Sequence, residues 1–349
     1  MTADMVAIGE ILIDFIPVTS DTYSDVPAFE KHFGGAPFNY AVAAARLGAE
    51  VGALAAVGTD PFGQFLIDTL NKNNVDTRHV KIKKQRTTLA FVVSEPNGEK
   101  SFFFYRKPWF ETADTMLSPS DVDPAYLRSA KILHYSGVAL SHSPERDAVF
   151  KAIENTHASG GLISYDPNIR LELWSSNDEL RAMNDIAMRK ADIILLAKDE
   201  AEFLFGKCAP KKIVAKIKDK CHPRYVALKL GDQGSHVEDE AGTSFFKPAY
   251  EVKVVDTTGA GDGWDAAFDY GLIEGWDLET CITVANAVGA LTVTKRGATS
   301  AMPTIAELNE FLRKRGIALQ QLKPSGQRLL TNCKSDKVPK CKNESDKDS

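Results

Sequence analysis

The stretch GGAPFNYAVAAARLGAEVGALAAVG, from Gly34 to Gly58, decides the fold. It starts with a glycine turn, continues as an alanine-rich helix that ends at Gly48, and then enters the apolar segment VGALAAVG. A short continuous apolar run of this kind is typical of a strand that is buried on both faces. A helix that leads into such a strand predicts a mainly parallel sheet covered by helices.

The same alternation continues on both sides of this stretch. Before it, MVAIGEILIDFIPV (5–18) predicts a first strand that runs on past Asp14, and after it residues 60–75 predict a helix with a polar end. Further strands are expected at 130–137, 161–168, 191–197 and 224–242, the last of them including a turn. Further helices are expected near 144–159, 178–190 and 199–206, as a pair within 264–293, and at 304–316. The sequence therefore predicts an α/β fold.

One segment interrupts the alternation. TTLAFVVSEPNGEKSFFFYRKP (87–108) holds two apolar runs around Asn97–Gly98, which is a β-hairpin signal. We expect this hairpin to form an appendage such as a lid, within one folded unit that covers residues 1–322. Residues 323–349 are rich in Lys, Ser, Asp and Asn, and a segment with so few apolar residues is expected to be disordered.

The composition argues against several classes of protein. The 349 residues carry a net charge of −5 and no long basic run, so nucleic acid is not an expected partner. The 5 cysteines lie far apart, which favours reduced thiols in a cytoplasmic protein over a disulfide framework. Asp4, Glu10 and Asp14 interrupt the amino-terminal apolar run, so neither a signal peptide nor a membrane partner is expected.

A second glycine motif, DTTGAGDGWDAAF (256–268), lies late in the chain. Gly259, Ala260 and Gly261 come directly before Asp262 and an apolar, helix-like run. The start of a helix exposes unpaired N–H groups and a partial positive charge, so a bare turn at this place can receive an anion. The alternative is that Asp262 only caps an ordinary helix. The chain has neither a GxxxxGK[ST] nor a GxGxxG sequence, so neither a P-loop nor a Rossmann site is expected.

The two glycine motifs, with DPNIR (166–170) between them, resemble those of the ribokinase-like sugar kinases, also called the phosphofructokinase B family. Gly48, Gly58 and the segment NAVGALTVTKRGATSAMPT (286–304) are similar as well, so the resemblance extends over about residues 5–315. It implies a three-layer α/β/α fold with a small β lid, formed from about residues 12–33 and 88–108. It also implies the ATP-dependent phosphorylation of a sugar hydroxyl. ATP and Mg²⁺ are the implied cofactors, and dependence on K⁺ is left open.

The resemblance also implies roles for individual residues. The N–H groups of Gly259, Ala260 and Gly261 would hold the transferring phosphate, and Asp262 would take the proton from the attacking hydroxyl. The implied sugar-binding residues are Asp14, Gly34, Gly35, Asn39, Arg106 and Arg170. The implied nucleotide-binding residues are Lys229, Gly231, Gly234 and Asn286, and Glu200 is implied in an indirect contact with the metal.

Several of these side chains have a structural alternative. Asp14 could be a solvated acid at the end of a strand, and Asn39 could be a helix cap. Arg106 could be a solvated charge on the lid, while Lys229 and Asn286 could be surface residues.

Two places depart from the family pattern. Ala197 stands three residues before Glu200, where the family often has Asn or Ser, so one polar contact to nucleotide phosphate or metal-bound water is lost; Lys198 could compensate. Gly263-Trp264-Asp265 stands where small or aliphatic residues are usual. Asp265 shares a helical face with Asp269, which puts tight packing of that helix against the sheet in doubt.

Three stretches are most like those of fructokinases: FYRKP (104–108), SYDPNIRLELW (164–174) and ADIILLAKDEAEFLFG (191–206). D-fructose is therefore the expected acceptor. The alternative is 2-keto-3-deoxygluconate, whose carboxylate Arg106 and Arg170 could bind. A more distant alternative is a sugar sensor that uses the fold for binding only. The apolar run SFFFY (101–105) would be awkward if it were exposed, which favours a homodimer through the lid.

Overall fold

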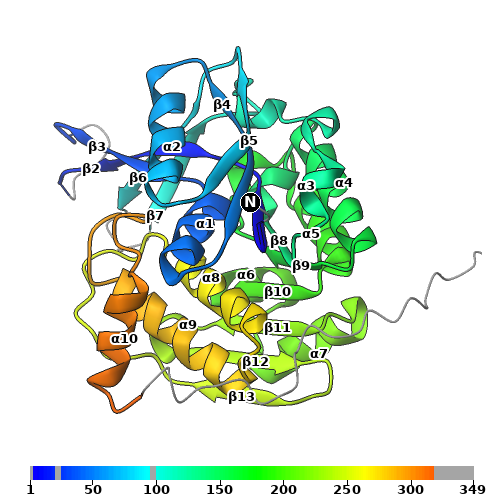
Figure 1. Cartoon of the computed structure of the whole chain (residues 1–349), viewed down its shortest axis with the longest axis vertical. Coiled ribbons are helices and arrows are strands. Elements are labelled where there is room, and N and C mark those ends of the chain that lie inside the picture. The colour runs from blue at the N-terminus through cyan, green and yellow to red at the C-terminus, as the bar shows by residue number, and fades with distance from the viewer. Residues whose placement is uncertain (1–2, 20–24, 95–99, 318–349) are drawn as a thin grey trace, which may run out of the picture.

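The computed structural model describes residues 3–19, 25–94 and 100–317 (Figure 1). The tail expected at 323–349 and the hairpin tip expected at Asn97–Gly98 lie outside the described residues. Within these described ranges, no helix combines the length and the apolar character that crossing a bilayer requires.

A nine-stranded sheet forms the centre of the molecule, in the order β13-β12-β11-β10-β9-β8-β1-β4-β5. The strands from β11 to β5 are parallel, and β12 and β13 add an antiparallel edge. The bounds are β1 (Met5–Ile8), β4 (Val51–Gly58), β5 (Asp76–Lys83), β8 (Ile132–Ser136), β9 (Leu162–Asp166), β10 (Ile193–Ala197), β11 (Tyr225–Lys229), β12 (Ser235–Asp239) and β13 (Ser244–Lys247).

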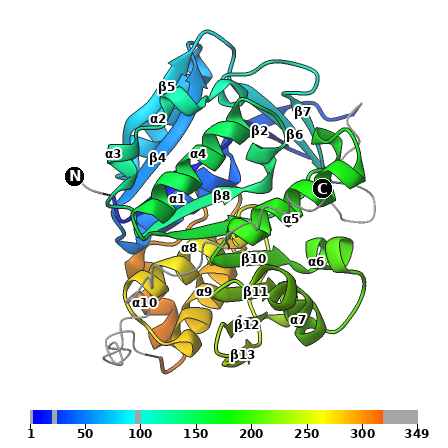
Figure 2. The ribbon, with the colours of Figure 1, turned by 90° about the vertical axis from the view of Figure 1, so that its right-hand side faces the viewer.

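Helices cover both faces of this sheet, which confirms the predicted three-layer α/β/α fold (Figure 2). Alternate residues of β10 show why: Ile193 and Leu195 pack against one helical layer, and Ile194 and Leu196 against the other. One layer holds α1 (Ala36–Leu47), α2 (Pro61–Lys72), α8 (Ala260–Ile273), α9 (Leu278–Thr292) and α10 (Ile305–Arg313). The other holds α3 (Pro124–Leu127), α4 (Glu145–Ala158), α5 (Asn177–Lys190), α6 (Lys198–Phe205) and α7 (Pro210–Cys221).

A second sheet of four strands, in the order β3-β2-β6-β7, forms the predicted small β lid. Its strands are β2 (Leu12–Pro17), β3 (Phe29–Gly34), β6 (Thr88–Ser94) and β7 (Lys100–Tyr105). Apart from Gly34, they fall inside the two segments expected to form the lid. Figure 1 shows this sheet beside the carboxyl ends of the central strands, where it can cover a ligand.

The first expected strand is in fact two strands in different sheets. β1 ends at Ile8 in the central sheet, and β2 begins at Leu12 in the lid. Gly9 has a φ of 140°, a conformation that favours glycine, and a Cβ at this position would lie 3.0 Å from the Cβ of Ala139. The chain therefore turns at Gly9 and carries the residues after it out of the central sheet and into the lid sheet.

Candidate active site

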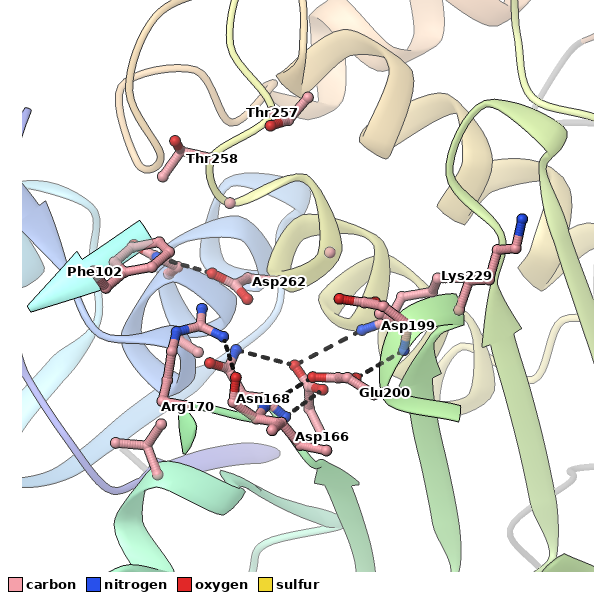
Figure 3. A pocket seen from close by; sticks show the side chains of 18 of the residues that line it. Phe102, Asp166, Asn168, Arg170, Asp199, Glu200, Lys229, Thr257, Thr258 and Asp262 are labelled. Atoms are coloured by element: carbon pink, nitrogen blue, oxygen red, sulfur yellow. Dashed lines mark hydrogen bonds and ion pairs between the residues drawn. The ribbon is translucent and has the colours of Figure 1, made fainter. Parts of the chain in front are cut away.

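A cavity of about 980 Å³ opens between the lid and the central sheet. The lid contributes residues of β2 and β7, and the sheet contributes the ends of β9, β10 and β11, at Asp166, Ala197 and Lys229. Figure 3 shows side chains that line it. Ligands of parallel α/β sheets bind outside the carboxyl ends of the strands, so this cavity is the candidate active site.

The glycine turn before α8 borders this cavity. Gly259 has a φ of 77°, in the left-handed region, and a Cβ there would lie 2.8 Å from the Cβ of Ala298. Gly259 and Gly261 line the cavity, whereas Ala260 does not, and the N–H of Ala260 donates to the carbonyl of Thr257 at 3.3 Å. The amino-terminal end of α8 thus faces the cavity, and an anion is favoured there.

Asp262 lies in the first turn of α8 and lines the same cavity (Figure 3). Its Oδ2 accepts a hydrogen bond of 2.8 Å from Nδ2 of Asn39 on α1. Burial, reinforced by the charge of Asp166, raises the pKa of Asp262 to about 6, although Asn39, Lys229 and Arg170 act in the opposite direction. The residue that caps α8 is Gly259, so Asp262 is not needed as a cap, and its carboxylate is available to a ligand in the cavity.

The early glycine motif forms the lid side of the cavity, which Asp14, Gly35 and Asn39 line. Gly34 does not line it, but a Cβ on Gly34 would lie 2.3 Å from Oδ2 of Asp14. Gly35 has a φ of 105°, and a Cβ there would lie 2.4 Å from the carbonyl oxygen of Glu10. Gly34 therefore leaves room for the side chain of Asp14, and Gly35 leaves room for the backbone at Glu10.

Glu10 is a cavity residue that sequence reasoning missed. Its carboxylate accepts hydrogen bonds from Oγ of Ser136, at 2.9 and 2.8 Å, and from the N–H of Ala36 at 3.3 Å. Burial raises its pKa to about 7, against the opposing charge of Arg106. An acid directly after the buried strand VAIG was the signal that could have revealed it.

The structure does not place Arg106 on the cavity, in contrast to the expectation that it binds substrate. Its side chain is 0% exposed, and its guanidinium is bound by Asp114, at 2.9 Å, and by Glu145 and Ser141. Two buried carboxylates therefore already occupy the groups with which Arg106 would hold a ligand. It is not a solvated lid charge either.

Arg170 does line the cavity, as expected. Its guanidinium carbon lies 4.6 Å from the centre of the Phe102 ring on lid strand β7, a cation–π geometry, and one of its N–H groups donates to the carbonyl of Ile169. Figure 3 shows Arg170 and Phe102 on the same side of the cavity as Asp262. Arg170 is therefore the arginine that can reach a bound sugar.

Only two of the four expected nucleotide residues, Lys229 and Gly231, line the cavity. Gly234 has a φ of 106°, and a Cβ there would lie 2.0 Å from the carbonyl oxygen of Lys247, so it is required by the turn itself. Asn286 is buried, accepts hydrogen bonds from Trp264 and Ser235, and donates to the carbonyls of Lys247 and Pro248. Its side chain joins these segments of the fold and does not line the cavity.

Lys229 is held by acids rather than exposed. Its Nζ lies 2.7 Å from Oδ2 of Asp265 and 3.7 Å from Oδ2 of Asp166. Burial alone would lower the pKa of Lys229, but the charges of Asp166, Asp265 and Glu200 outweigh it and raise that pKa above its usual range. The doubt about the packing of α8 is also removed, because Asp265 and Asp269 are both 0% exposed and paired.

Glu200 lines the cavity beside Asp166 (Figure 3). Its two oxygens accept hydrogen bonds from the N–H groups of Ile169, at 2.9 Å, and Ala197, at 2.8 Å. Burial, and then the charge of Asp166, raise the pKa of Glu200 to about 7. The backbone N–H of Ala197 therefore helps to position Glu200, and this contact does not need a polar side chain at residue 197.

The carboxylate oxygens of Glu200 and Asp166 fit a magnesium ion that arrives with a nucleotide. Mg²⁺ usually keeps several waters and is bound through one or two carboxylates together with substrate phosphates. Glu200 and Asp166 supply carboxylates of that kind at the same part of the cavity. In the part of the chain that the structure describes, no three His, Cys, Asp or Glu side chains form a ready-made metal site.

The chain matches the pfkB family of carbohydrate kinases over residues 2–305. It is 37% identical over 319 residues to fructokinase-1 of Oryza sativa, covering 88% of this chain and 97% of that one. Its structure resembles a Xylella fastidiosa fructokinase with bound ATP (TM-score 0.80, 27% identity, 89% and 98% of the two chains). It also resembles a Vibrio cholerae fructokinase variant with bound fructose, ADP and potassium (TM-score 0.79, 32% identity, 89% and 99%). The chain therefore belongs to the pfkB family of carbohydrate kinases, which transfer phosphate from ATP to an alcohol group of a sugar.

Proposed function

We propose that the protein transfers the γ-phosphoryl group of ATP to D-fructose and forms fructose 6-phosphate. The observation that carries the proposal is that Asp262 directly follows the glycine turn at 259–261, accepts a hydrogen bond from Asn39, and lines one cavity together with Asp14. An acceptor hydroxyl next to Asp262 would face a phosphate held at that turn. The fructokinases among the similar proteins support fructose as the sugar.

In the proposed reaction the sugar hydroxyl attacks the γ-phosphorus of ATP, the bond to the β-phosphate oxygen breaks, and ADP leaves. Asp262 accepts the hydroxyl proton, and the amino-terminal end of α8, at Gly259 and Gly261, stabilises the charge on the transferred group. Magnesium, held near Glu200 and Asp166, would neutralise part of the phosphate charge.

The charges at the lid side of the cavity favour a neutral sugar over an acidic one. Glu10 and Asp14 both line this part, and each can accept hydrogen bonds from sugar hydroxyls. Arg106, the residue that would have held a substrate carboxylate together with Arg170, is enclosed by Asp114 and Glu145. A carboxylate substrate would therefore find one arginine and two acids, which disfavours it.

A keto-acid kinase is the second candidate, because Arg170 remains in the cavity and can bind a carboxylate bidentately. The deciding experiment is to measure kcat/KM with Mg·ATP for fructose and for 2-keto-3-deoxygluconate, and to locate the phosphate on the product by ³¹P NMR. A preference for fructose of tenfold or more is expected. A tenfold preference for the acid would overturn fructose as the substrate but not the role of Asp262. If none of the sugars tested leads to the release of ADP, a sugar sensor without kinase activity would be favoured.

We also propose a homodimer through the lid. Tyr105 on β7 and the neighbouring Trp109 and Phe110 are 46%, 54% and 52% exposed, and the rings of Tyr105 and Phe110 stack with centroids 5.5 Å apart. Exposed aromatic groups of this size are typical of interfaces. Sedimentation velocity should show a dimer that Trp109→Glu dissociates, whereas a wild-type monomer at micromolar concentration would contradict the proposal.

Exchange of K⁺ for Li⁺ in the kinase assay tests whether the activity depends on potassium.

A further inference from the structure

α8 carries three buried acids on one face, and the phosphoryl-transfer reaction uses only the first. Asp262, Asp265 and Asp269 are spaced by three and four residues, so they share that face. Asp262 is bound to Asn39, and Asp269 accepts a hydrogen bond of 2.8 Å from the Tyr40 hydroxyl on α1. Asp265 differs from both, because its partner is a charged residue of the cavity.

The ion pair between Asp265 and Lys229 lies directly beneath the glycine turn. Lys229 Nζ is 2.7 Å from Oδ2 of Asp265, which is 0% exposed. A Cβ on Gly261 would lie 3.5 Å from the same Nζ, so the ammonium group lies close to the glycine turn that borders the cavity. Among the described residues, Oδ1 of Asp265 has no hydrogen-bond partner, while Oδ2 accepts the hydrogen bond from Lys229.

The charge of Lys229 matters for the base. The charged groups that act on Asp262 are Asp166 at the end of β9, Arg170 beyond it, Lys229 at the end of β11, and Asp265 on its own helix; α1 contributes the uncharged Asn39. A nearby cation stabilises a carboxylate and makes it a weaker proton acceptor. A cation that is already paired with a carboxylate has a smaller effect, because the two fields largely cancel.

We propose that Asp265 is a positioning residue of the kinase site, which holds the Lys229 ammonium under the turn at 259–261 and balances its charge, so that Lys229 does not weaken Asp262 as a proton acceptor. This inference rests on the proposed role of Asp262. It adds a residue that does not line the cavity and that acts on the reaction through Lys229.

The first test is the pH dependence of kcat/KM for the sugar in Asp265→Asn, which keeps the shape of the side chain and removes its charge. Lys229 would then have only the more distant Asp166, at 3.7 Å, as an ion-pair partner, so the acid limb of the profile should move about half a pH unit or more to lower pH. Asp269→Asn is the matched control, since it removes a buried acid one turn further along the same helix, and its acid limb should stay in place. An unmoved limb in Asp265→Asn, with only a lower melting temperature, would show a purely structural role and overturn the proposal.

Lys229→Met supplies a second test that does not depend on the folding of Asp265→Asn. A buried carboxyl group without a partner takes up a proton, so the loss of Lys229 should neutralise Asp265 as well. The acid limb should then stay within about a quarter of a pH unit of the wild type, and adding Asp265→Asn should not move it further. Two results would overturn the proposal. One is a clear shift of the acid limb to higher pH in Lys229→Met. The other is that Asp265→Asn shifts the acid limb to lower pH by the same amount whether or not Lys229 is present.

Calorimetric titration with ADP separates this proposal from the choice of sugar. Asp265→Asn should bind ADP several-fold more tightly than the wild type, because one negative charge near the phosphate site is lost, and the gain should vanish in the Lys229→Met background. If the wild type phosphorylated none of the sugars offered, the proposed function would fail while this titration still decided the role of Asp265. Equal ADP affinities of wild type and Asp265→Asn would contradict that role.

Discussion

The side-chain amide of Asn39 on α1 donates a hydrogen bond of 2.8 Å to the carboxylate of Asp262 on α8, across a separation of 223 residues. The bond joins the early and the late glycine motif at one point of the cavity. It also acts on the pKa of Asp262, which burial raises and this hydrogen bond lowers. The two motifs therefore set the protonation of the proposed base together.

The activity of the wild type should depend on pH through Asp262. Its pKa in the folded protein is about 6, so the carboxylate that accepts the proton is present above that pH and is lost as the pH falls through it. A plot of log(kcat/KM) against pH should bend near 6 on its acid side. A flat profile down to pH 5 would contradict the assignment.

Replacement of Asn39 should move this bend. Asn39→Ala removes a hydrogen bond to the charged form, so the pKa of Asp262 should rise and the acid limb should shift to higher pH. Asn184→Ala is a suitable control, because Asn184 is also buried and hydrogen-bonded but lies on α5 beside Tyr165. That control should lower the melting temperature and leave the limb in place; a shift in both variants would point to a general loosening of the fold.

Truncation of Arg106 should affect the stability of the protein, whereas truncation of Arg170 should affect the KM for the sugar. Arg106→Ala leaves Asp114 and Glu145 buried without their cation, which should cost about 3–5 kcal/mol of unfolding free energy. Arg170→Ala removes a side chain at the cavity and should raise the KM for the sugar with little change in stability. Thermal denaturation together with sugar saturation curves distinguishes them. An Arg106→Ala variant as stable as the wild type would contradict the structural role of that arginine.

Asp269 should make stability depend on pH. Burial raises its pKa to about 7, far above that of an unfolded aspartate, so the folded protein holds a proton that the unfolded chain releases. The resulting stabilisation is complete below about pH 4 and is lost as the pH rises through 7. The melting temperature of Asp269→Asn should therefore fall less between pH 5 and 8 than that of the wild type. Asp68→Asn, on the exposed side of α2, should leave the wild-type dependence unchanged.

The layers of the fold could be predicted because their signals are local. Buried strands such as VGALAAVG and the helices between them are visible as apolar runs and helical spacing. The edge strand β5 was missed because its sequence, DTRHVKIK, is largely polar, as befits an edge strand. α7 was missed although Ile213, Val214 and Ile217 have helical spacing, because its many lysines obscured the apolar face.

Partners of charged side chains could not be predicted in the same way. Arg106 is enclosed by Asp114 and Glu145, and nothing in their sequence positions shows that α4 brings the second acid to the guanidinium. Asn286 was expected to face the nucleotide, but its four hydrogen bonds come from segments that meet only in the folded chain. The place of Asp262 in the first turn of a helix, by contrast, could be predicted, because the glycine turn and the helix it begins are adjacent in sequence.

The most direct test of the account is the turnover of Asp262→Asn with Mg·ATP and the preferred sugar. Asparagine keeps the shape of the side chain and can still meet Asn39, but it cannot accept the hydroxyl proton. If Asp262 is the base, kcat should fall by roughly 10²- to 10⁴-fold, with the affinity for ATP nearly unchanged in a calorimetric titration. Turnover close to that of the wild type would contradict the central claim that the acid at the end of the glycine turn takes the proton from the sugar.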